Sequence, residues 1–253
     1  MPHVYIMFRQ SNSRGSGPDA DIISAYRGPT ATIQAWNNVT FAAFDITVND
    51  TYPVNAGFSG AQCAFLHKEQ QRLGETIYFV MYSVGGTPLY DDGTNNCWIS
   101  TRAAGLHTTL KSTLNGALVY MWNTLNIRTN YHFIFVPQGG ENDTLADANA
   151  NAYQTNSEAE IQSFLLNFGT AFDSSPKRWM IPRLSVNQTF YDATRLATVQ
   201  GKVDALCAAD SANRCAYNTD SQTVNVDGQH YIHVGGYQPE GEGMSVQCAI
   251  LGW

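Results

Sequence analysis

The sequence is poor in charge. Only 14% of its 253 residues are Asp, Glu, Lys or Arg, whereas about a quarter is usual in globular proteins. The formal net charge is −7, the isoelectric point is about 5.2, and no basic cluster is present, so we expect no nucleic-acid partner. A surface with few charges and many Asn, Thr, Ser and Gln side chains is common in proteins that work outside cells or on glycans.

Long hydrophobic runs are also missing. None approaches the roughly 18 apolar residues that span a bilayer, so we expect no membrane partner. The apolar run Val4 to Phe8 is too short for the core of a signal peptide and is typical of a buried strand. We therefore expect an extracellular protein or a part of a larger exported protein whose signal lies outside this sequence, and otherwise a cytoplasmic one.

Motifs for metals, nucleotides and redox chemistry are absent. The five cysteines include no C-x-x-C pair, and His230-x-x-His233 lacks the spacing of a helical zinc site. No Walker A sequence and no G-x-S-x-G elbow occurs, and no G-x-G-x-x-G follows an apolar run. The sequence thus predicts no metal and no organic cofactor. Cys207 and Cys215 flank a polar loop and could form a disulfide, while five free thiols fit the sequence equally well.

Short apolar runs alternate with amphipathic segments along the chain. This alternation predicts a three-layer α/β/α sandwich in one domain, residues 1–253, with a central parallel sheet of about five strands. We expect strands in 3–8, 77–83, 132–136, 179–186 and 216–219, and a short strand or hairpin in 39–48. We expect helices in 59–73, 106–121, 192–208 and 235–250, and one opened by a capping box at Ser157-x-x-Glu160. The polar segment from Ser13 to Asn38 is expected to be irregular.

Polar motifs follow several of these strands. Ser11, Gly85-Gly86 and Gln138 to Asp143 each come directly after a strand, and His230 comes after the last one. The carboxyl ends of parallel strands share one edge of a sheet, so we expect these motifs to converge there. A serine nucleophile needs a histidine base that is oriented by a carboxylate.

The carboxylate and the base each have a competitor. Asp227 stands three residues before His230 and suits the orienting role, whereas Asp220 is a rival acid near the end of the last strand. His233 is a rival base, but it has no carboxylate three residues before it. We therefore favour Ser11, His230 and Asp227.

These motifs resemble those of a known superfamily. Gln10-Ser11-Asn12 is similar to the Gly-Gln-Ser-Asn nucleophile motif of the SGNH hydrolases, and more narrowly of their carbohydrate-esterase branch, which includes acetylxylan esterases and sialate 9-O-acetylesterase-like domains. Three more blocks match the family in order: Ser83 to Thr87, Gln138 to Asp143, and Asp227-x-x-His230. The resemblance implies a flavodoxin-like SGNH fold and a serine esterase that removes O-acetyl groups from carbohydrate through an acyl-enzyme.

The resemblance also implies an oxyanion hole. Its donors would be the backbone N–H groups of Ser11 and Gly86 and one side-chain amide. Asn142 fits the Gly-x-Asn-Asp block of the superfamily, and Gln138 fits the Gln-Gly-Glu block of the esterase branch. We slightly favour Gln138, which lies nearer to the strand end.

Arg9 stands where the family has glycine. If its backbone keeps a negative φ, its guanidinium can point to solvent or to a carboxylate, and it would suit an acidic sugar. Arg9, Gln10 and Trp98 are then the candidate substrate contacts, and Trp36 and Tyr90 are further aromatic platforms for the sugar. In the alternative, Arg9 distorts the turn and the protein is a catalytically impaired glycan-binding module on an esterase scaffold. We favour the working enzyme.

Overall fold

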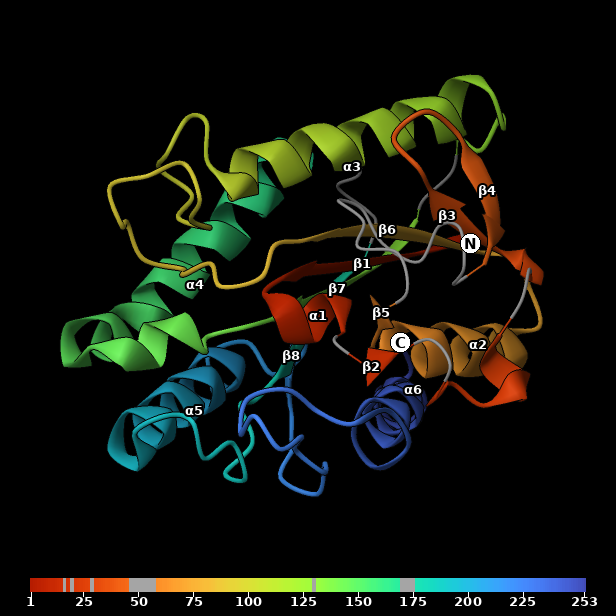
Figure 1. Ribbon diagram of the computed structural model, residues 1–253. Helices are drawn as coiled ribbons and strands as arrows, with labels where there is room; N and C mark the ends of the chain where they lie inside the picture. Colours follow the sequence, from red (N-terminus) through yellow and green to blue (C-terminus); the bar gives the residue numbers. More distant parts are fainter. Residues whose placement is uncertain (16, 19–20, 28–29, 46–57, 129–130, 169–175) are drawn as a thin grey trace.

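The computed structural model describes residues 1–253 except 16, 19–20, 28–29, 46–57, 129–130 and 169–175. A mostly parallel sheet of seven strands forms the centre of the molecule, in the order β4-β3-β6-β1-β7-β8-β9 (Figure 1). Only the pairing of β3 with β4 is antiparallel. The strands are β1 (His3–Arg9), β3 (Thr30–Trp36), β4 (Phe41–Phe44), β6 (Ile77–Ser83), β7 (His132–Gln138), β8 (Lys177–Pro182) and β9 (Arg214–Tyr217).

Helices cover both faces of this sheet. They are α1 (Ser11–Arg14), α2 (Gln62–Leu73), α3 (Leu106–Asn123), α4 (Asp147–Phe168), α5 (Ala193–Ala208) and α6 (Gln238–Leu251). Single helical turns span Ser24–Tyr26, Asn142–Leu145 and His233–Tyr237, and β2 (Gly17–Pro18) and β5 (Phe58–Ser59) form a separate antiparallel pair. In the described part of the chain, no helix is both long enough and apolar enough to cross a membrane.

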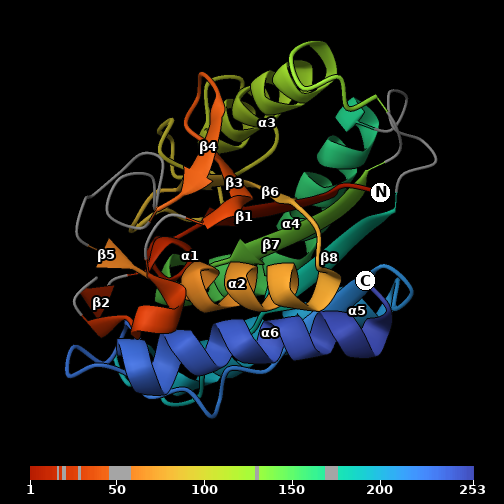
Figure 2. The same cartoon turned by 90° about the vertical axis from the view of Figure 1, so that its right-hand side faces the viewer.

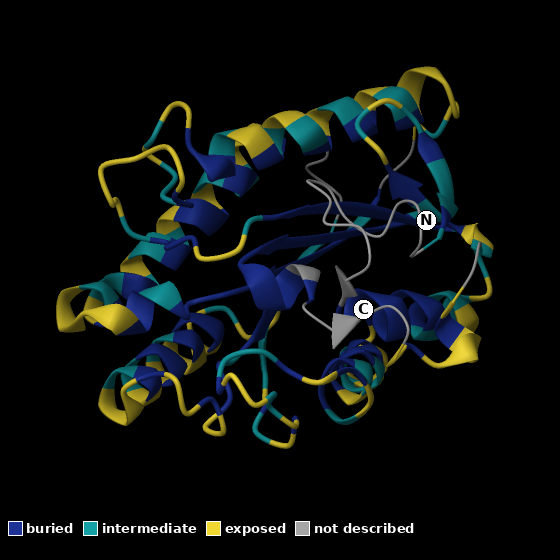
Figure 3. Ribbon diagram, in the orientation of Figure 1, coloured by how far each residue is buried: buried dark blue, intermediate teal, exposed yellow. Residues whose placement is uncertain are grey.

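The side chains of the central strand β1 explain why helices pack on both faces of the sheet. Successive side chains of a strand point to opposite faces, so His-Val-Tyr-Ile-Met-Phe supplies apolar groups to both sides. Val4, Ile6 and Phe8 pack in one core with residues of α3, α4 and α5, whereas Tyr5 and Met7 pack in the other with residues of α2 and α6. Figure 2 shows the sheet between α3 and α4 on one side and α2 and α6 on the other, and Figure 3 shows that its central strands are buried.

Several expected elements are confirmed. The strands predicted at the positions of β1, β6, β7, β8 and β9 are present, and so are the helices predicted at α2, α3, α5 and α6. Asp192 caps α5 as expected, because its Oδ1 accepts hydrogen bonds from the backbone N–H groups of Thr194 and Arg195 at 3.0 Å. Gly74 ends α2 in the left-handed conformation, with a φ of 67°.

The expected sheet of about five strands is too small. Strand β3 lies in the segment that we expected to be irregular, and it pairs with β4 as a hairpin at the edge of the sheet. Its sequence, Thr-Ala-Thr-Ile-Gln-Ala-Trp, is only partly apolar because several of its side chains remain exposed at this edge. Residues 46–48 of the expected strand 39–48 lie outside the described residues.

The expected capping box is also wrong. Helix α4 begins at Asp147, a full ten residues before Ser157, so Ser157 and Glu160 lie in the interior of the helix. Both side chains are completely buried and serve another purpose, which is described below. The five cysteines are free thiols, so the disulfide between Cys207 and Cys215 is not formed.

Candidate active site

Ser11 lies at the carboxyl end of β1, in the middle of the sheet. Strand β1 ends at Arg9, and Ser11 is the first residue of the short helix α1. The backbone N–H of Gln10 donates to the Gln138 carbonyl at 3.0 Å, and the N–H of Val84 donates to the Arg9 carbonyl at 2.9 Å. These bonds join the segment before Ser11 to both neighbouring strand ends, so the expected convergence at this edge of the sheet is observed.

His230 and Asp227 meet Ser11 there. The Oγ of Ser11 lies 2.9 Å from Nε2 of His230, and Nδ1 of the same ring lies 2.7 Å from Oδ2 of Asp227. Asp220, the rival acid, instead accepts a hydrogen bond from the backbone N–H of Val186 at 2.9 Å. His233, the rival base, is buried in the core on the α6 side of the sheet, where it packs against Tyr237.

A tight turn presents the histidine to the serine. Gly228, between the acid and the base, has a φ of 70°, and a Cβ there would lie 2.7 Å from Oγ1 of Thr189. Glycine is therefore needed at this position. The Gln229 carbonyl accepts a hydrogen bond from Nε2 of Gln188 at 2.7 Å, and the Asn225 N–H donates to the His230 carbonyl at 2.6 Å. These contacts fix the loop that carries His230.

The electrostatics of Asp227 suit an orienting carboxylate. Partial burial alone would raise its pKa, but Oδ1 accepts hydrogen bonds from the N–H groups of His230 and Gln229 at 2.9 and 2.8 Å. These bonds and the nearby imidazole lower the pKa of Asp227 below its ordinary value. Asp227 is thus ionised at neutral pH and able to accept a hydrogen bond from Nδ1–H of the histidine.

Gln10 links two loops of the site through both atoms of its side-chain amide. Its Oε1 accepts hydrogen bonds from the N–H groups of Gly140 and Glu141 at 3.0 and 2.9 Å, and its Nε2 donates to the Thr87 carbonyl. The side chain is buried. Our expectation that Gln10 contacts the substrate is therefore wrong, and its role is to hold the loops after β6 and β7 together.

Two of the residues expected to bind an oxyanion, Gly86 and Asn142, lie in or against a turn beside Ser11. A Cβ on Gly85 would lie 3.6 Å from Cβ of Ser11, so this turn passes beside the serine, and Gly86 gives it a left-handed φ of 69°. The side chain of Asn142 is partly exposed, and its Nδ2 donates to the Gly86 carbonyl at 2.6 Å. Asn142 thus lies against the turn that flanks Ser11.

Gln138, which we favoured from the sequence, is oriented differently. Its side chain is buried, and its Nε2 donates to Oε1 of Glu240 on helix α6 at 2.7 Å. Burial raises the pKa of Glu240 well above its ordinary value, and the nearby Glu141 raises it further. Glu240 was not identified from the sequence as a site residue, because the glycines of helix α6 obscured the apolar pattern that marks a helix.

Asn12 connects the serine to a second buried acid. Its Nδ2 donates to Oε1 of Glu141 at 2.7 Å, and its Oδ1 accepts a hydrogen bond from the Tyr237 hydroxyl at 2.8 Å. Burial raises the pKa of Glu141. The motif Gln10-Ser11-Asn12 therefore places one buried, hydrogen-bonded amide on each side of the Ser11 hydroxyl.

The side chain of Arg9 points into the protein. Its φ is 94°, so the expected negative value is wrong, and its exposed fraction is 2%. The guanidinium contacts a carboxylate, as we considered, but this is Glu160 in the interior, at 3.1 Å from Nε and 2.5 Å from Nη2. It also donates to the Tyr153 hydroxyl at 2.7 Å and to Oγ of Ser157 at 3.3 Å. Arg9 is therefore not a substrate contact.

Sequence reasoning missed the partners of Arg9. Tyr153, Ser157 and Glu160 recur at helical spacing on the face of α4 that also carries the buried Ile161 and Phe164. The sequence did contain a signal for these partners, because they are polar residues on an otherwise apolar face of the helix. A charge that is buried needs such polar partners. Burial alone would raise the pKa of Glu160, but the guanidinium and His107 lower it.

A neighbouring glycine makes room for the arginine. A Cβ on Gly139 would lie 3.1 Å from Cβ of Arg9 and 3.3 Å from Cγ of Gln10, both close contacts. Gly140 has a φ of 119°, and a Cβ there would lie 3.0 Å from the Tyr153 ring. Gly139 and Gly140, in the motif Gln138 to Asp143, thus allow the backbone to pass close to buried side chains of β1 and α4.

Trp98 is not a platform for a sugar either. It is completely buried, its Nε1 donates to Oγ1 of Thr87 at 2.8 Å, and its ring packs near Phe8 and Tyr82. Tyr90 is half-buried in the loop after β6, and Trp36 lies at the edge of the sheet. Of the three expected platforms, only these two have exposed atoms.

The fold is similar to those of known esterases. A protein of Arabidopsis thaliana matches with a TM-score of 0.71 at 14% identity, over 98% of this chain and 96% of that one. A carbohydrate acetylesterase from Sinorhizobium meliloti matches with a TM-score of 0.56 at 12% identity, over 98% and 99% of the two chains. A carbohydrate acetylesterase from Xanthomonas citri matches with 0.59 at 12% identity, over 98% of this chain and 56% of that one.

Sequence comparison alone does not find these relatives. No protein-family model and no curated protein matches the sequence. The likeness therefore rests on structure and concerns the fold. The protein has the α/β/α fold of these two carbohydrate acetylesterases, and the three-layer architecture predicted from the sequence is confirmed.

Proposed function

We propose that the protein is a serine esterase that removes O-acetyl groups from carbohydrate. The observation that supports this most is the hydrogen-bonded series from Ser11 through His230 to Asp227 at the carboxyl edge of the sheet. Open α/β sheets bind their ligands at this edge. Two of the structural neighbours are carbohydrate acetylesterases by name, which supports the choice of substrate class.

In the proposed reaction, Oγ of Ser11 attacks the acetyl carbonyl while Nε2 of His230 takes the hydroxyl proton. Asp227 holds the ring with Nδ1–H towards its own Oδ2 and stabilises the imidazolium that forms. The imidazolium then protonates the leaving sugar oxygen, which leaves an acetyl group on Ser11. A water molecule, deprotonated by the same nitrogen, attacks the acetyl-serine and releases acetate.

The developing oxyanion needs donors aimed at its position. We assign the backbone N–H groups of Ser11 and Gly86 to this role. Of the two side-chain candidates we now favour Asn142, because it lies against the Gly85-Gly86 turn, whereas Nε2 of Gln138 is engaged by Glu240. Rotation of Asn142 away from the Gly86 carbonyl would bring its amide towards a bound acetyl group.

The position of Arg9 favours an enzyme over the impaired glycan-binding module. That alternative requires Arg9 to distort the turn or fill the pocket. The guanidinium instead lies between β1 and α4, and Ser11 remains 2.9 Å from its histidine. The substitution of the family glycine by arginine is therefore compatible with the geometry that hydrolysis needs.

Removal of the serine hydroxyl tests the proposal. We expect Ser11→Ala to lower the hydrolysis of 4-nitrophenyl acetate and of acetylated xylan by about 10⁴-fold to 10⁶-fold, because only oxyanion and binding effects would remain. Ser13→Ala is the matched control: this serine lies in the same short helix, and its Oγ accepts a hydrogen bond from the Ser83 hydroxyl, whereas Ser11 is the serine paired with His230. Equal rates for the parent and Ser11→Ala would refute the proposal.

A further inference from the structure

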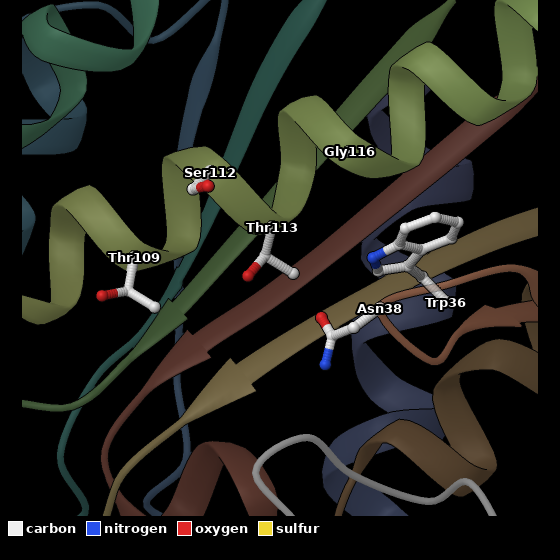
Figure 4. Close-up of a pocket in the computed structure, with 6 residues that line it drawn as sticks. All are labelled: Trp36, Asn38, Thr109, Ser112, Thr113 and Gly116. Atoms are coloured by element: carbon white, nitrogen blue, oxygen red, sulfur yellow. The ribbon is translucent and has the colours of Figure 1, made fainter.

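A second polar pocket lies away from the triad, between helix α3 and the β3–β4 hairpin. Its volume is about 230 Å³, and it is lined by Trp36, Asn38, Thr109, Ser112, Thr113 and Gly116 (Figure 4). None of these residues contributes to the site around Ser11, and none carries a charge. The pocket is smaller than the roughly 300–1,000 Å³ of typical drug-sized sites, so it suits a single small ring.

Trp36 offers a hydrogen-bond donor to this pocket. The tryptophan is 9% exposed, and its indole nitrogen points towards the side of the pocket where Asn38 and Thr113 lie (Figure 4). Among the described residues, none accepts a hydrogen bond from this N–H. An indole N–H can only donate, and a nearly buried donor gains free energy from a partner. The pocket therefore lacks an acceptor that a ligand can supply.

The indole is held in this orientation by its neighbours. Its ring packs near Phe41 and Tyr120, with centroids 5.2 and 5.6 Å away. Oγ1 of Thr40 donates to the Tyr120 hydroxyl at 2.7 Å, which fastens the hairpin turn to α3. Because these rings occupy the surroundings of the indole, Trp36 presents an edge with its N–H and does not provide a flat face for stacking.

Helix α3, which forms the wall of the pocket opposite Trp36, supplies hydroxyl groups. Ser112 and Thr113 lie on α3, and no described residue shares a hydrogen bond with either hydroxyl. The side-chain amide of Asn38 adds a donor and an acceptor from the hairpin turn, where its φ is 75°. A neutral ligand with several hydroxyl groups offers both the donors and the acceptors that complement these groups.

We infer that this pocket binds a neutral sugar unit of an oligosaccharide at a subsite separate from the triad. The inference rests on the proposed function only for the choice of a polysaccharide as the source of the sugar. None of the described residues that line the pocket is charged, so the chemistry selects an uncharged sugar rather than an acidic one.

The register of the sheet gives the separation of the two sites. Ala35 pairs with Phe79, and Phe79 pairs with Tyr5, so Trp36 is level with Ile6 on a strand two places away. With strands about 4.8 Å apart and a rise of about 3.3 Å per residue, Trp36 lies roughly 10 Å to the side of Ser11 and roughly 15 Å before it. One sugar cannot reach both sites, whereas an extended oligosaccharide can.

The direct test is binding of unacetylated oligosaccharides, because these carry no group for the esterase to remove. The probes are xylohexaose, cellohexaose and mannohexaose, and the readout is the NMR shift of the Trp36 indole N–H, assigned with Trp36→Phe. We expect a saturable shift with at least one probe at millimolar concentration. No saturable shift with any of the three would overturn the inference.

Gly116→Leu fills the pocket without disturbing the fold. A Cβ on Gly116 would lie 3.5 Å from Cζ2 of Trp36, an ordinary contact, and leucine favours a helix more than glycine does. Helical side chains lean towards the N-terminus of the helix, so this leucine would extend towards Ser112 and Thr113. We expect it to weaken binding at least tenfold with no loss of thermal stability. Binding that survives this change would overturn the inference.

Thr113→Val removes one hydroxyl and keeps the shape. The expected loss is about twofold to tenfold, the range of one hydrogen bond. Thr198→Val, at a half-buried threonine of α5, is the matched control and should bind as the parent does. Equal losses in Thr113→Val and Thr198→Val would count against the site.

Hydrolysis of 4-nitrophenyl acetate separates this inference from the proposed function. This small ester does not reach the pocket, so Gly116→Leu should hydrolyse it at the rate of the parent, and a clear loss would overturn the separateness of the two sites. A parent that binds the sugar but shows no Ser11-dependent hydrolysis would refute the esterase and leave the subsite supported.

Discussion

Two groups of charged and polar side chains meet at the end of β1, and they differ in their access to water. In the triad, Asp227 is 43% exposed and His230 is 20% exposed at the side chain. Two residues before Ser11, Arg9 and Glu160 are 2% and 0% exposed. A carboxylate contacts a basic partner in both groups, but only His230 and Asp227 have side chains that a ligand in solution can reach. Access to solvent, rather than the type of interaction, distinguishes the group that we propose to be reactive from the structural one.

The same difference governs what each group contributes to stability. An exposed ion pair contributes about 0–1 kcal/mol, because water solvates its charges when it breaks. A buried charge that loses its partner costs about 3–5 kcal/mol. Changes in the triad should therefore lower activity and leave folding intact, whereas changes in the Arg9–Glu160 pair should lower stability first.

After Ser11→Ala, the largest effect is expected for Asp227→Asn. The asparagine amide would hold the histidine in the wrong tautomer, so turnover should fall by about 10⁴-fold while the melting temperature stays nearly unchanged. Asp220→Asn is the control, because Asp220 caps the Val186 N–H and does not contact His230. Steady-state kinetics and thermal unfolding of both variants test this. A mild Asp227→Asn beside a damaging Asp220→Asn would show that the carboxylate is wrongly assigned.

The next largest effect is expected for the buried pair. Glu160→Ala removes the carboxylate and leaves the guanidinium unpaired, so we expect a loss of about 3–5 kcal/mol in the free energy of unfolding. Arg9→Gly should cost less, because glycine suits the φ of 94° that costs arginine about 1–3 kcal/mol. Denaturant unfolding of both single variants and of the double variant Arg9→Gly/Glu160→Ala gives the coupling between the two positions.

The activity of Arg9→Gly bears on the alternative function. If the enzyme is functional with Arg9 in place, this variant should keep most of the parental turnover once it is folded. An impaired scaffold would instead gain hydrolysis from the glycine. Appearance of esterase activity only in Arg9→Gly would favour the glycan-binding module.

A smaller effect is expected for the oxyanion donor. Asn142→Ala should lower turnover by about 10²-fold to 10³-fold with little change in KM, because the bond forms only in the transition state. Gln138→Ala should lower stability instead, since it removes the donor to the buried Glu240. Kinetics and unfolding of the two variants distinguish them. A larger loss of turnover in Gln138→Ala at unchanged stability would restore the assignment that we made from the sequence.

The smallest effect concerns pH and Asp143, which is buried near Arg9. Burial raises its pKa to about 7, so the folded protein binds a proton that the unfolded chain has released above about pH 4. This group's contribution to stability is therefore present at low pH and is lost as the pH rises towards 7. We expect Asp143→Asn to remove a pH-dependent contribution on the order of 2 kcal/mol between pH 5 and 7, measured by denaturant unfolding. Identical pH dependence in the parent and the variant would contradict this.

The sequence predicted the layers and the convergence of motifs because both follow from local patterns. Apolar runs mark buried strands, and Ser11, Gly85 and His230 follow such runs. Strand β3, next to the edge strand β4, escaped prediction because its exposed side chains make it resemble a loop. The exact pairing of His230 with Asp227 depends on the turn at Gly228, which spacing indicates only approximately.

Side-chain direction was the least predictable property. Nothing in the local sequence shows that Arg9 points inward or that Ser157 and Glu160 receive it, because the contact joins residues that are far apart in the chain. The prediction that Trp98 lies in the site failed for the same reason, because the local sequence does not show which way its side chain points. Its loop position suggested exposure, whereas the core between β1 and α3 encloses it.

The buried amide of Gln10 affects how well the loops around Ser11 are ordered before a ligand binds. One buried amide ties the loop after β6 to the loop after β7 through three hydrogen bonds, so these loops cannot open independently. The ordering of the groups around Ser11 is thus completed during folding, and a ligand need not supply free energy to arrange them. If the proposed reaction takes place beside Ser11, the buried amide of Gln10 lowers the entropic cost of binding its substrate.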